Sequence, residues 1–334
     1  MSDQKRIESL LRDNGMAFEG PTRIQLIKQH NHIYQIQTDG WVGFLKLYTK
    51  DWYGDDIAGT GYCVDHEIAA WQTLASAGLA VPEVLLADGF ISNSLQRPFL
   101  MTRRLEGAPL TTLAQQADAP ERAALLNAVG SYLAQMHRIR FEFPGYITSK
   151  PLAPLQADEW QHPIWTFEAF ERDALATWQR DREQVSDRLM DQVERFSRSY
   201  RAELEKEYRS PRFVHGDCHA SQFFLLKREG VWHVTGVLDM EVASAGDMGA
   251  DFVKFSLEMA ALLPAETAWW QPLLEGYSTP VNFNLIKLRL LALGHHNYAW
   301  IWPGTREQII THLLKATDWY SLFDLTHLRN SLPL

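Results

Sequence analysis

Cysteine is scarce in this sequence, which has only Cys63 and Cys218 in 334 residues. The two lie far apart and neither has CxxC spacing, so a zinc or redox pair of that type is excluded and a reducing compartment is expected. A run of about 18 apolar residues is also missing, and the N-terminus has no apolar segment long enough for a signal peptide. These absences predict a soluble, cytoplasmic protein that does not enter a membrane.

A basic excess is absent as well. The 32 lysines and arginines are outnumbered by 41 acids, which gives a formal net charge of −9. Proteins that bind nucleic acids usually carry a basic excess or stripe, so we predict no nucleic-acid partner. Low-complexity segments are missing too. With 46% apolar residues the chain can bury a sizeable core, in one large domain or two smaller ones, and the oligomeric state stays open.

The first hundred residues have the pattern of β-strands with one helix. Residues 31–38 and 43–48 are β-branched or aromatic runs separated by a turn at Asp39 and Gly40, which predicts a hairpin. Lys46 falls in the middle of the second strand. Because side chains alternate between the two faces of a strand, Lys46 shares its face with Phe44 and Tyr48, opposite Leu45 and Leu47.

Apolar spacing over residues 63–79 predicts a helix that carries Glu67 and stops at Gly78. Two more strand-like runs follow, and the second breaks at Glu106 and Gly107, which makes residues 102–107 a candidate linker. Beyond it the pattern is mainly helical, with a capped helix start at Asp118 and a helical region over 160–209. Residues 222–240 interrupt it and predict a β-hairpin.

The stretch FVHGDCHASQFF (213–224) concentrates His215, Asp217 and His219 within five residues. Taken alone it fits a metal site, a general base or a polar loop without chemistry. Phosphoryl transfer from a nucleotide would explain why these residues lie together. That reaction needs a cation on the phosphates, magnesium ligands and a carboxylate that accepts the proton of the attacking hydroxyl.

The parts of a kinase occur here in the expected order. In the general template, a strand lysine pairs with a helix glutamate, and a loop of the form H-x-D-x-x-x-x-N precedes a metal-binding aspartate. The matching residues, in chain order, are Lys46, Glu67, His215, Asp217, Gln222 and Asp239. Glutamine stands where the template has asparagine.

These motifs resemble the signature of the aminoglycoside phosphotransferase and choline kinase superfamily. Its members typically show HGD-x-x-x-x-N followed by D-W-E-x-A-x-x-G-D-x-x-x-D, and Met240 replaces the usual tryptophan. Residues 129–139 also resemble the family helix that ends in Leu-His. The second pattern is matched in register by Asp239, Glu241, Ala243, Gly246, Asp247 and Asp251.

The resemblance implies an α+β fold of the bilobal, protein-kinase-like type. Residues 1–103 would form a small β-rich N-lobe that binds the nucleotide. Residues 104–334 would form a larger, mainly helical C-lobe with the catalytic loop and the acceptor site. The implied cofactors are ATP, with GTP as the alternative, and Mg²⁺.

The same resemblance assigns roles to individual residues. Asp217 would be the catalytic base, and Gln222 with Asp239 would hold magnesium. Lys46, held by Glu67, would contact the α- and β-phosphates, and backbone groups around Met101 to Arg103 would receive the base. His215 would brace the loop by hydrogen bonding. Asp247 and Asp251 would cap or brace the helix that follows them.

Two features depart from the family pattern. The extra methylene of Gln222 displaces its amide oxygen by about 1.5 Å, whereas magnesium requires near-octahedral ligands at roughly 2.0–2.1 Å. Residues 26–35 contain no glycine where a glycine-rich loop would cover the phosphates. Both features keep open a slow kinase or a non-catalytic, nucleotide-binding regulatory protein on the same fold.

We therefore predict a small-molecule kinase that phosphorylates a hydroxyl of a sugar-, amino-alcohol- or antibiotic-like compound. Aromatic clusters at 160–170, 267–277 and 295–304 fit helix packing better than a substrate pocket. A metal-dependent hydrolase that uses H-x-D-x-H ligands is the remaining alternative, but it leaves Lys46, Glu67 and Asp239 unexplained.

Overall fold

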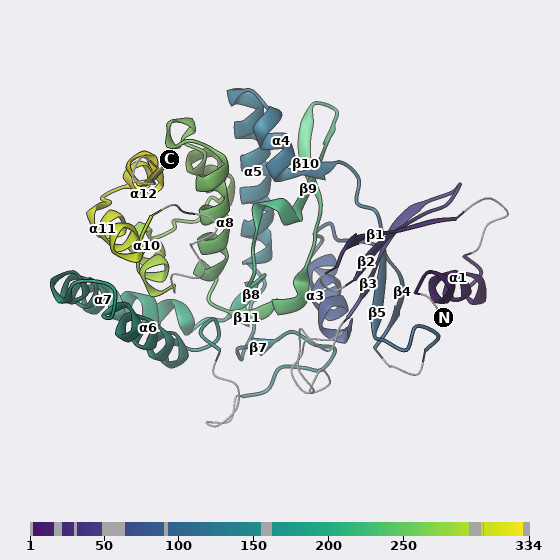
Figure 1. The fold of residues 1–334 in the computed structure, drawn as a ribbon, viewed down its shortest axis with the longest axis horizontal. Helices are drawn as coiled ribbons and strands as arrows, with labels where there is room; N and C mark the ends of the chain where they lie inside the picture. Colours follow the sequence, from purple (N-terminus) through teal and green to yellow (C-terminus); the bar gives the residue numbers. More distant parts are fainter. Residues whose placement is uncertain are drawn as a thin grey trace.

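The described residues of the N-terminal part form an antiparallel sheet together with helices α1 and α3. The computed structural model describes residues 3–16, 22–29, 32–48, 64–89, 93–154, 162–293, 302 and 304–329. The strand order of this sheet is β1-β2-β3-β5-β4, and it lies with α1 at one end of the molecule (Figure 1). Its elements are α1 (Asp3–Asp13), β1 (Arg23–Lys28), β2 (Ile33–Gln37), β3 (Val42–Leu47), α3 (Val64–Ser76), β4 (Val84–Asp88) and β5 (Phe99–Arg103).

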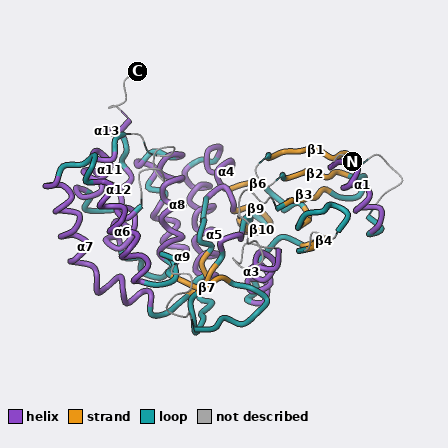
Figure 2. Tube along the Cα trace, turned by 60° about the horizontal axis from the view of Figure 1, so that its bottom comes forward, coloured by secondary structure: helices purple, strands orange, loops and turns teal. Residues whose placement is uncertain are grey.

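The rest of the chain is mainly helical and includes two small three-stranded sheets, β10-β9-β6 and β7-β11-β8. Figure 2 shows the helices gathered at the end away from the N-terminal sheet. The elements are β6 (Ala108–Pro109), α4 (Leu110–Gln116), α5 (Ala119–Met136), β7 (Gly145–Tyr146), α6 (Phe167–Asp181), α7 (Asp187–Tyr208), β8 (Arg212–Val214), β9 (Phe223–Arg228), β10 (Val231–Val237), β11 (Ser244–Gly246), α8 (Gly249–Leu262), α9 (Trp270–Tyr277), α10 (Phe283–Ala292), α11 (Arg306–Lys315), α12 (Trp319–Phe323) and α13 (Thr326–Arg329). Short 3₁₀ turns η1 (Ala220–Gln222), η2 (Met240–Val242) and η3 (Ala265–Thr267) connect some of them.

Strand β3 presents different faces to two hydrophobic clusters. Leu45 and Leu47 belong to the smaller cluster, which also contains buried residues of α1. Tyr48, just after the strand, belongs to the larger cluster with residues of α3. The alternation predicted from the sequence is therefore confirmed, and it turns Lys46 toward α3.

Several other predicted elements are confirmed. Helix α5 starts at the predicted cap, where the Asp118 side chain accepts a hydrogen bond from the Glu121 amide at 2.9 Å, and β9 and β10 form the predicted hairpin. The helical region 160–209 is divided into α6 and α7. Trp269, Trp270 and Trp302 are buried in the larger cluster, as expected for packing, and the remaining residues of 295–303 lie outside the described residues.

The predicted division between residues 103 and 104 remains a proposal. The larger cluster takes buried residues from before that point, among them Trp71 and Leu100, together with residues of α5, α8, α9 and α10. The two proposed lobes would therefore share an apolar contact along α3. None of the described helices is long and apolar enough to cross a bilayer.

Two glycines allow α5 and α9 to pack in direct backbone contact. A Cβ atom at Gly130 would lie 2.0 Å from the Leu273 carbonyl oxygen, and one at Gly276 would lie 2.1 Å from that of Asn127. We expect Gly130→Ala to lower the free energy of unfolding by about 1–3 kcal/mol, because the helices must separate. Urea unfolding measures this, with Gly89→Ala as the control, since a Cβ there meets nothing within 4 Å. Equal stability of the two variants would contradict the close packing.

Candidate active site

Lys46 of β3 forms a buried ion pair with Glu67 of α3. Its Nζ lies 2.8 Å from Glu67 Oε2, and the Tyr48 hydroxyl donates to the same oxygen at 2.6 Å. Lys46 is 9% exposed and Glu67 is 2% exposed. Because α3 begins at Val64, Glu67 lies in its first turn and faces the strand. The structure thus brings together the two residues that the sequence paired.

Two further carboxylates lie against the same ammonium group. Lys46 Nζ is 3.4 Å from Asp239 Oδ1 and also forms an ion pair with Glu241. Burial would lower the pKa of Lys46, but the charge of Glu67 and those of its other neighbours raise it well above the usual value. Burial raises the pKa of Glu241 to about 7, although Lys46 opposes this. Three acids, Glu67, Asp239 and Glu241, surround the single lysine, so this cluster favours the binding of an additional cation.

Asp239 has a left-handed backbone conformation, with φ 66° and ψ 51°, which non-glycine residues rarely adopt. Neighbouring contacts fix the chain on either side of it. The Trp71 indole donates to the Val237 carbonyl at 3.1 Å, and the Leu238 amide donates to the Gln222 carbonyl at 3.1 Å. Such strained residues are maintained where the surroundings overdetermine them, often at functional sites.

The loop that begins at His215 is attached to α8 through Asp251. The amides of His215 and Gly216 donate to the two carboxylate oxygens of Asp251 at 2.8 and 2.9 Å, and His137 Nε2 lies 3.1 Å from the same group. His215 contacts the Leu238 carbonyl through Nε2 and the Asp217 amide through Nδ1. With both ring nitrogens engaged, His215 is not available as the zinc ligand that a hydrolase would need.

Asp217 lies between two basic side chains. It forms an ion pair with Lys254 of α8, and its Oδ1 is 3.4 Å from His219 Nε2. Burial would raise the pKa of Asp217, but the hydrogen bond from His219 and the charge of Lys254 hold it well below its usual range. The carboxylate is therefore ionised at neutral pH. It is one-third exposed, and its exposed part faces a cavity.

That cavity has a volume of about 620 Å³, within the range of small-molecule sites. Residues of α6, α8 and α10 contribute to its wall, and Asp217 lies beside it. Its lining combines apolar groups with both signs of charge and includes His162, Phe170, Asp173, Thr177, Arg180 and Lys254. The cavity can therefore hold a polar compound of small size next to the carboxylate.

His162 in the wall of this cavity is neutral. Burial lowers its pKa to about 4, and its Nδ1 accepts a hydrogen bond from the Ile164 amide at 3.2 Å, which requires an unprotonated nitrogen. Because the unfolded chain binds this proton near pH 6.5 and the folded protein does not, stability falls as the pH drops from 6.5 toward 4.

We expect His162→Asn to remove this part of the acid sensitivity, about 3 kcal/mol at pH 4, since the asparagine oxygen still accepts the amide. Urea unfolding at pH 7, 5.5 and 4 measures it. An unchanged pH dependence in the variant would contradict a neutral, buried His162.

Gln222 lies beside this loop in the turn η1. Its Oε1 accepts a hydrogen bond from the His219 amide at 2.8 Å, so one lone pair of the oxygen is used and a second is left for a metal. Magnesium binds oxygen ligands, commonly one or two carboxylates with waters and phosphates. Asp239 and Glu241 supply such oxygens in an acid-rich group, so these residues fit Mg²⁺. In the described ranges there is no cluster of three or more His, Cys, Asp or Glu that forms a metal site of its own.

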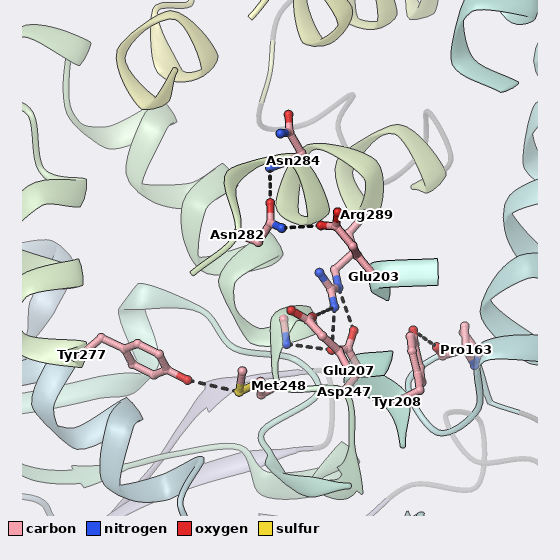
Figure 3. Close-up of polar contacts among 11 residues, drawn as sticks. Pro163, Glu203, Glu207, Tyr208, Asp247, Met248, Tyr277, Asn282, Asn284 and Arg289 are labelled. Carbon is pink, nitrogen blue, oxygen red and sulfur yellow. Dashed lines mark hydrogen bonds and ion pairs between the residues drawn. The ribbon is translucent and has the colours of Figure 1, made fainter. Parts of the chain in front are cut away.

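Asp247 lies against Arg289 and connects the start of α8 with α10 (Figure 3). Its carboxylate accepts hydrogen bonds from the Gly249 amide at 3.0 Å and from Arg289 at 2.6 and 2.7 Å. The same guanidinium also binds Glu207 of α7. The Asp247 side chain thus accepts a hydrogen bond from the first amide of α8, and the bracing role predicted for it from the sequence stays a prediction. The contacts to the loop come from Asp251, which the sequence had grouped with it.

The two residues predicted near the nucleotide base lie in β5. The Met101 side chain is buried in the smaller cluster. The Arg103 amide donates to the Glu83 carbonyl at 2.9 Å, and its guanidinium pairs with the Glu83 side chain. Their role in binding the base stays a prediction.

Sequence reasoning missed Lys254 and left Glu241 undecided. Lys254 lies three residues beyond Asp251, where the family pattern ends, and no motif marks it. Its spacing of four from Glu258 is the one available signal, since it puts both side chains on the face of α8 that meets the loop. Glu241 belongs to the family pattern, but only its contact with Lys46 reveals that it lies with Glu67 and Asp239.

Comparison with known proteins identifies the family and the fold. Residues 24–283 match the family model described as the phosphotransferase enzyme family (APH). A crystal structure of aminoglycoside phosphotransferase APH(4)-Ia is similar, with a TM-score of 0.56 and 14% identity over 94% of this chain and 99% of that one. A thermostable mutant of that protein in a ternary complex with AMP-PNP and hygromycin B gives 0.58 and 15%, over 92% and 98%.

The GDP complex of wild-type aminoglycoside 2′-phosphotransferase-IIIa is similar as well, with a TM-score of 0.54 and 13% identity over 99% of this chain and 98% of that one. At such identities the structures establish the α+β, kinase-like fold, while the family model covers most of the chain. The protein therefore belongs to the phosphotransferase enzyme family and is a small-molecule kinase.

Proposed function

We propose that the protein transfers the γ-phosphoryl group of ATP, or of GTP, to a hydroxyl group of a small molecule. The main observation behind this proposal is that Lys46 contacts Asp239, while Asp217, on the adjoining loop, faces a cavity of about 620 Å³. His215 links the two parts, because its ring contacts both the Asp217 amide and the carbonyl of Leu238, next to Asp239.

In this proposal the triphosphate lies along Lys46 and the acceptor occupies the cavity. Lys46 neutralises phosphate charge, and Glu67 with Tyr48 fixes its position. Asp239 and Gln222 would hold Mg²⁺, which would neutralise further charge on the phosphates. Met101 and Arg103 mark where the base would lie, next to the candidate linker.

Asp217 orients the acceptor and takes its proton. A hydroxyl oxygen within about 2.6–3.2 Å of the carboxylate is held for in-line attack on the γ-phosphorus. The low pKa of Asp217 makes it a weak base, so the proton moves late, once the bond to phosphorus has formed in large part. This suits a loose transition state, in which positioning contributes most.

The mixed charge of the cavity supports a neutral or zwitterionic hydroxyl compound of the sugar or amino-alcohol type. Arg180 and Lys254 face it together with Asp173, so it is not a mainly acidic pocket of the kind a polycation would need. Similar structures hold hygromycin B, and an antibiotic-like acceptor therefore belongs in the screen.

Thermal unfolding with ATP or ADP, with and without Mg²⁺, tests nucleotide binding, because a ligand that binds only the folded state raises the midpoint. A screen of hydroxyl compounds for ADP release then tests transfer. We expect stabilisation by nucleotide and ADP release with at least one sugar or amino alcohol. An unchanged midpoint would contradict the proposal.

A regulatory, non-catalytic role is the second candidate, since the Gln222 oxygen is already engaged by the His219 amide. Stabilisation by nucleotide without turnover on any acceptor would favour it.

A further inference from the structure

Besides Asp251, helix α8 presents Lys254 and Glu258, one turn apart, to the loop at His215. Lys254 forms an ion pair with Asp217 Oδ1. Glu258 accepts a hydrogen bond from the Ser221 amide at 3.2 Å and lies 3.7 Å from His219 Nδ1. Glu258 thus holds the loop, whereas Lys254 reaches Asp217, a carboxylate that faces the cavity.

The Lys254 ammonium group is accessible to a ligand. Its side chain is 37% exposed and lines the 620 Å³ cavity. An ammonium group carries three hydrogens, and within the described part of the chain Asp217 is its only hydrogen-bond acceptor. Two hydrogens are left to donate to a ligand in the cavity.

The Lys254 ammonium group binds the Asp217 carboxylate, to which the acceptor hydroxyl would also bind. This common partner limits how far the ammonium group can lie from the transferred phosphoryl group. An attacking hydroxyl lies about 2.6–3.2 Å from an Asp217 oxygen and about 3–3.5 Å from the γ-phosphorus. A cation bound to the same carboxylate, on the same side as the hydroxyl, can therefore approach to within roughly 4–6 Å of that phosphorus. At this separation a non-bridging phosphoryl oxygen can accept a hydrogen bond from the ammonium.

Two of the neighbouring cations are occupied by carboxylates. Lys46 contacts Glu67, Asp239 and Glu241, and Arg289 is bound by Asp247 and Glu207. The segment 26–35 also lacks the glycines that would let backbone amides approach the phosphates. A cation at the acceptor end of the transferred group would supply charge that this site otherwise has in short supply.

We propose that Lys254 is a catalytic residue that donates a hydrogen bond to the transferred phosphoryl group while it orients Asp217. The proposal rests on the phosphotransfer function proposed above. In the step, the acceptor oxygen forms a bond to the γ-phosphorus, and the bond from that phosphorus to the β–γ bridging oxygen breaks. The bridging oxygen keeps the electron pair and leaves as ADP, and the hydroxyl proton passes to Asp217. Lys254 keeps its protons throughout and neutralises charge on the group in transit.

The test compares Lys254→Met and Lys254→Ala with Lys206→Met. Lys206 is an exposed residue of α7 outside the site, so its variant controls for loss of a lysine charge. With ATP, Mg²⁺ and a hydroxyl compound that the wild type phosphorylates, we expect both Lys254 variants to lose about 10²- to 10³-fold in kcat. The KM for ATP should stay within about threefold, and added ethylammonium should restore part of the kcat of Lys254→Ala.

The outcomes separate this proposal from a structural role and from failure of the function itself. Undiminished kcat in Lys254→Met, or a loss confined to KM, overturns the role of Lys254 while the phosphotransfer function stands. A loss that tracks a lower unfolding midpoint and is not rescued by the amine also overturns it. A wild type that binds ATP but releases no ADP with any hydroxyl compound or with water contradicts the proposed function, and this inference with it.

Discussion

Asp217→Asn is expected to lower kcat by about 10²- to 10⁴-fold, the usual contribution of a positioned general base. Asparagine has nearly the same shape and can keep an oxygen toward Lys254 and His219, but it carries no negative charge and its amide cannot accept the hydroxyl proton. The nucleotide contacts proposed for Lys46 and Asp239 do not involve this side chain, so ATP binding should change little. Steady-state ADP release and an ATP titration by thermal unfolding measure the two effects separately.

Asp191→Asn is the matched control for this substitution. Asp191 is an exposed acid of α7 that pairs with Arg182, remote from the catalytic loop in sequence, and its variant should keep wild-type turnover. If Asp217→Asn retains turnover within threefold of the wild type, Asp217 is not the base. If it loses nucleotide binding along with turnover, the loop is a structural part of the nucleotide site.

The features that the sequence predicted correctly depend on local patterns. Alternation along 43–48 placed Lys46 and Tyr48 on one face of β3, and helical spacing placed Glu67 on the next element. Their pairing then follows from the order of elements in the fold. The hairpin after Gln222 and the capped start of α5 are local in the same sense, since turn and cap residues act within a few positions.

The features that sequence reasoning missed depend on contacts between distant segments. Lys254 reaches Asp217 only because α8 packs across the loop, and Asp251 holds that loop through two backbone amides. Asp247 has the same residue type and lies four positions earlier, yet it faces Arg289 of α10. Asp251 and Asp247 therefore have different partners because α8 packs between the loop at His215 and helix α10. The sequence motif does not contain this information.

Gln222 illustrates how a departure from a motif can have a local cause. Its longer side chain reaches back to the His219 amide at the start of η1, while the His219 side chain closes the capping box from the other side. The glutamine thus stabilises the turn that follows Asp217. From the sequence alone the extra methylene of Gln222 indicated only a displaced metal ligand. The contact with the His219 amide could not be predicted, because it depends on the conformation of the turn η1.

Arg289→Met is expected to lower the free energy of unfolding by about 3–5 kcal/mol, the usual cost of removing one partner of a buried ion pair. The guanidinium is 5% exposed and binds Asp247 and Glu207. Methionine fills a similar length but leaves the Asp247 carboxylate, which is 1% exposed, with the Gly249 amide as a remaining donor. An unpaired charge in the interior loses its hydration without compensation, and α10 loses its ion pairs with Asp247 and Glu207.

Urea unfolding followed by tryptophan fluorescence measures this loss, because several tryptophans lie in the core that these helices share. Arg209→Met is the control: its side chain is 72% exposed and pairs with Glu205 one turn away on α7, so its loss should cost less than about 1 kcal/mol. The double variant Asp247→Asn/Arg289→Met should be more stable than Arg289→Met, since it also removes the stranded charge. A double variant less stable than Arg289→Met would instead mean that Asp247 contributes mainly through its bond to Gly249 at the start of α8.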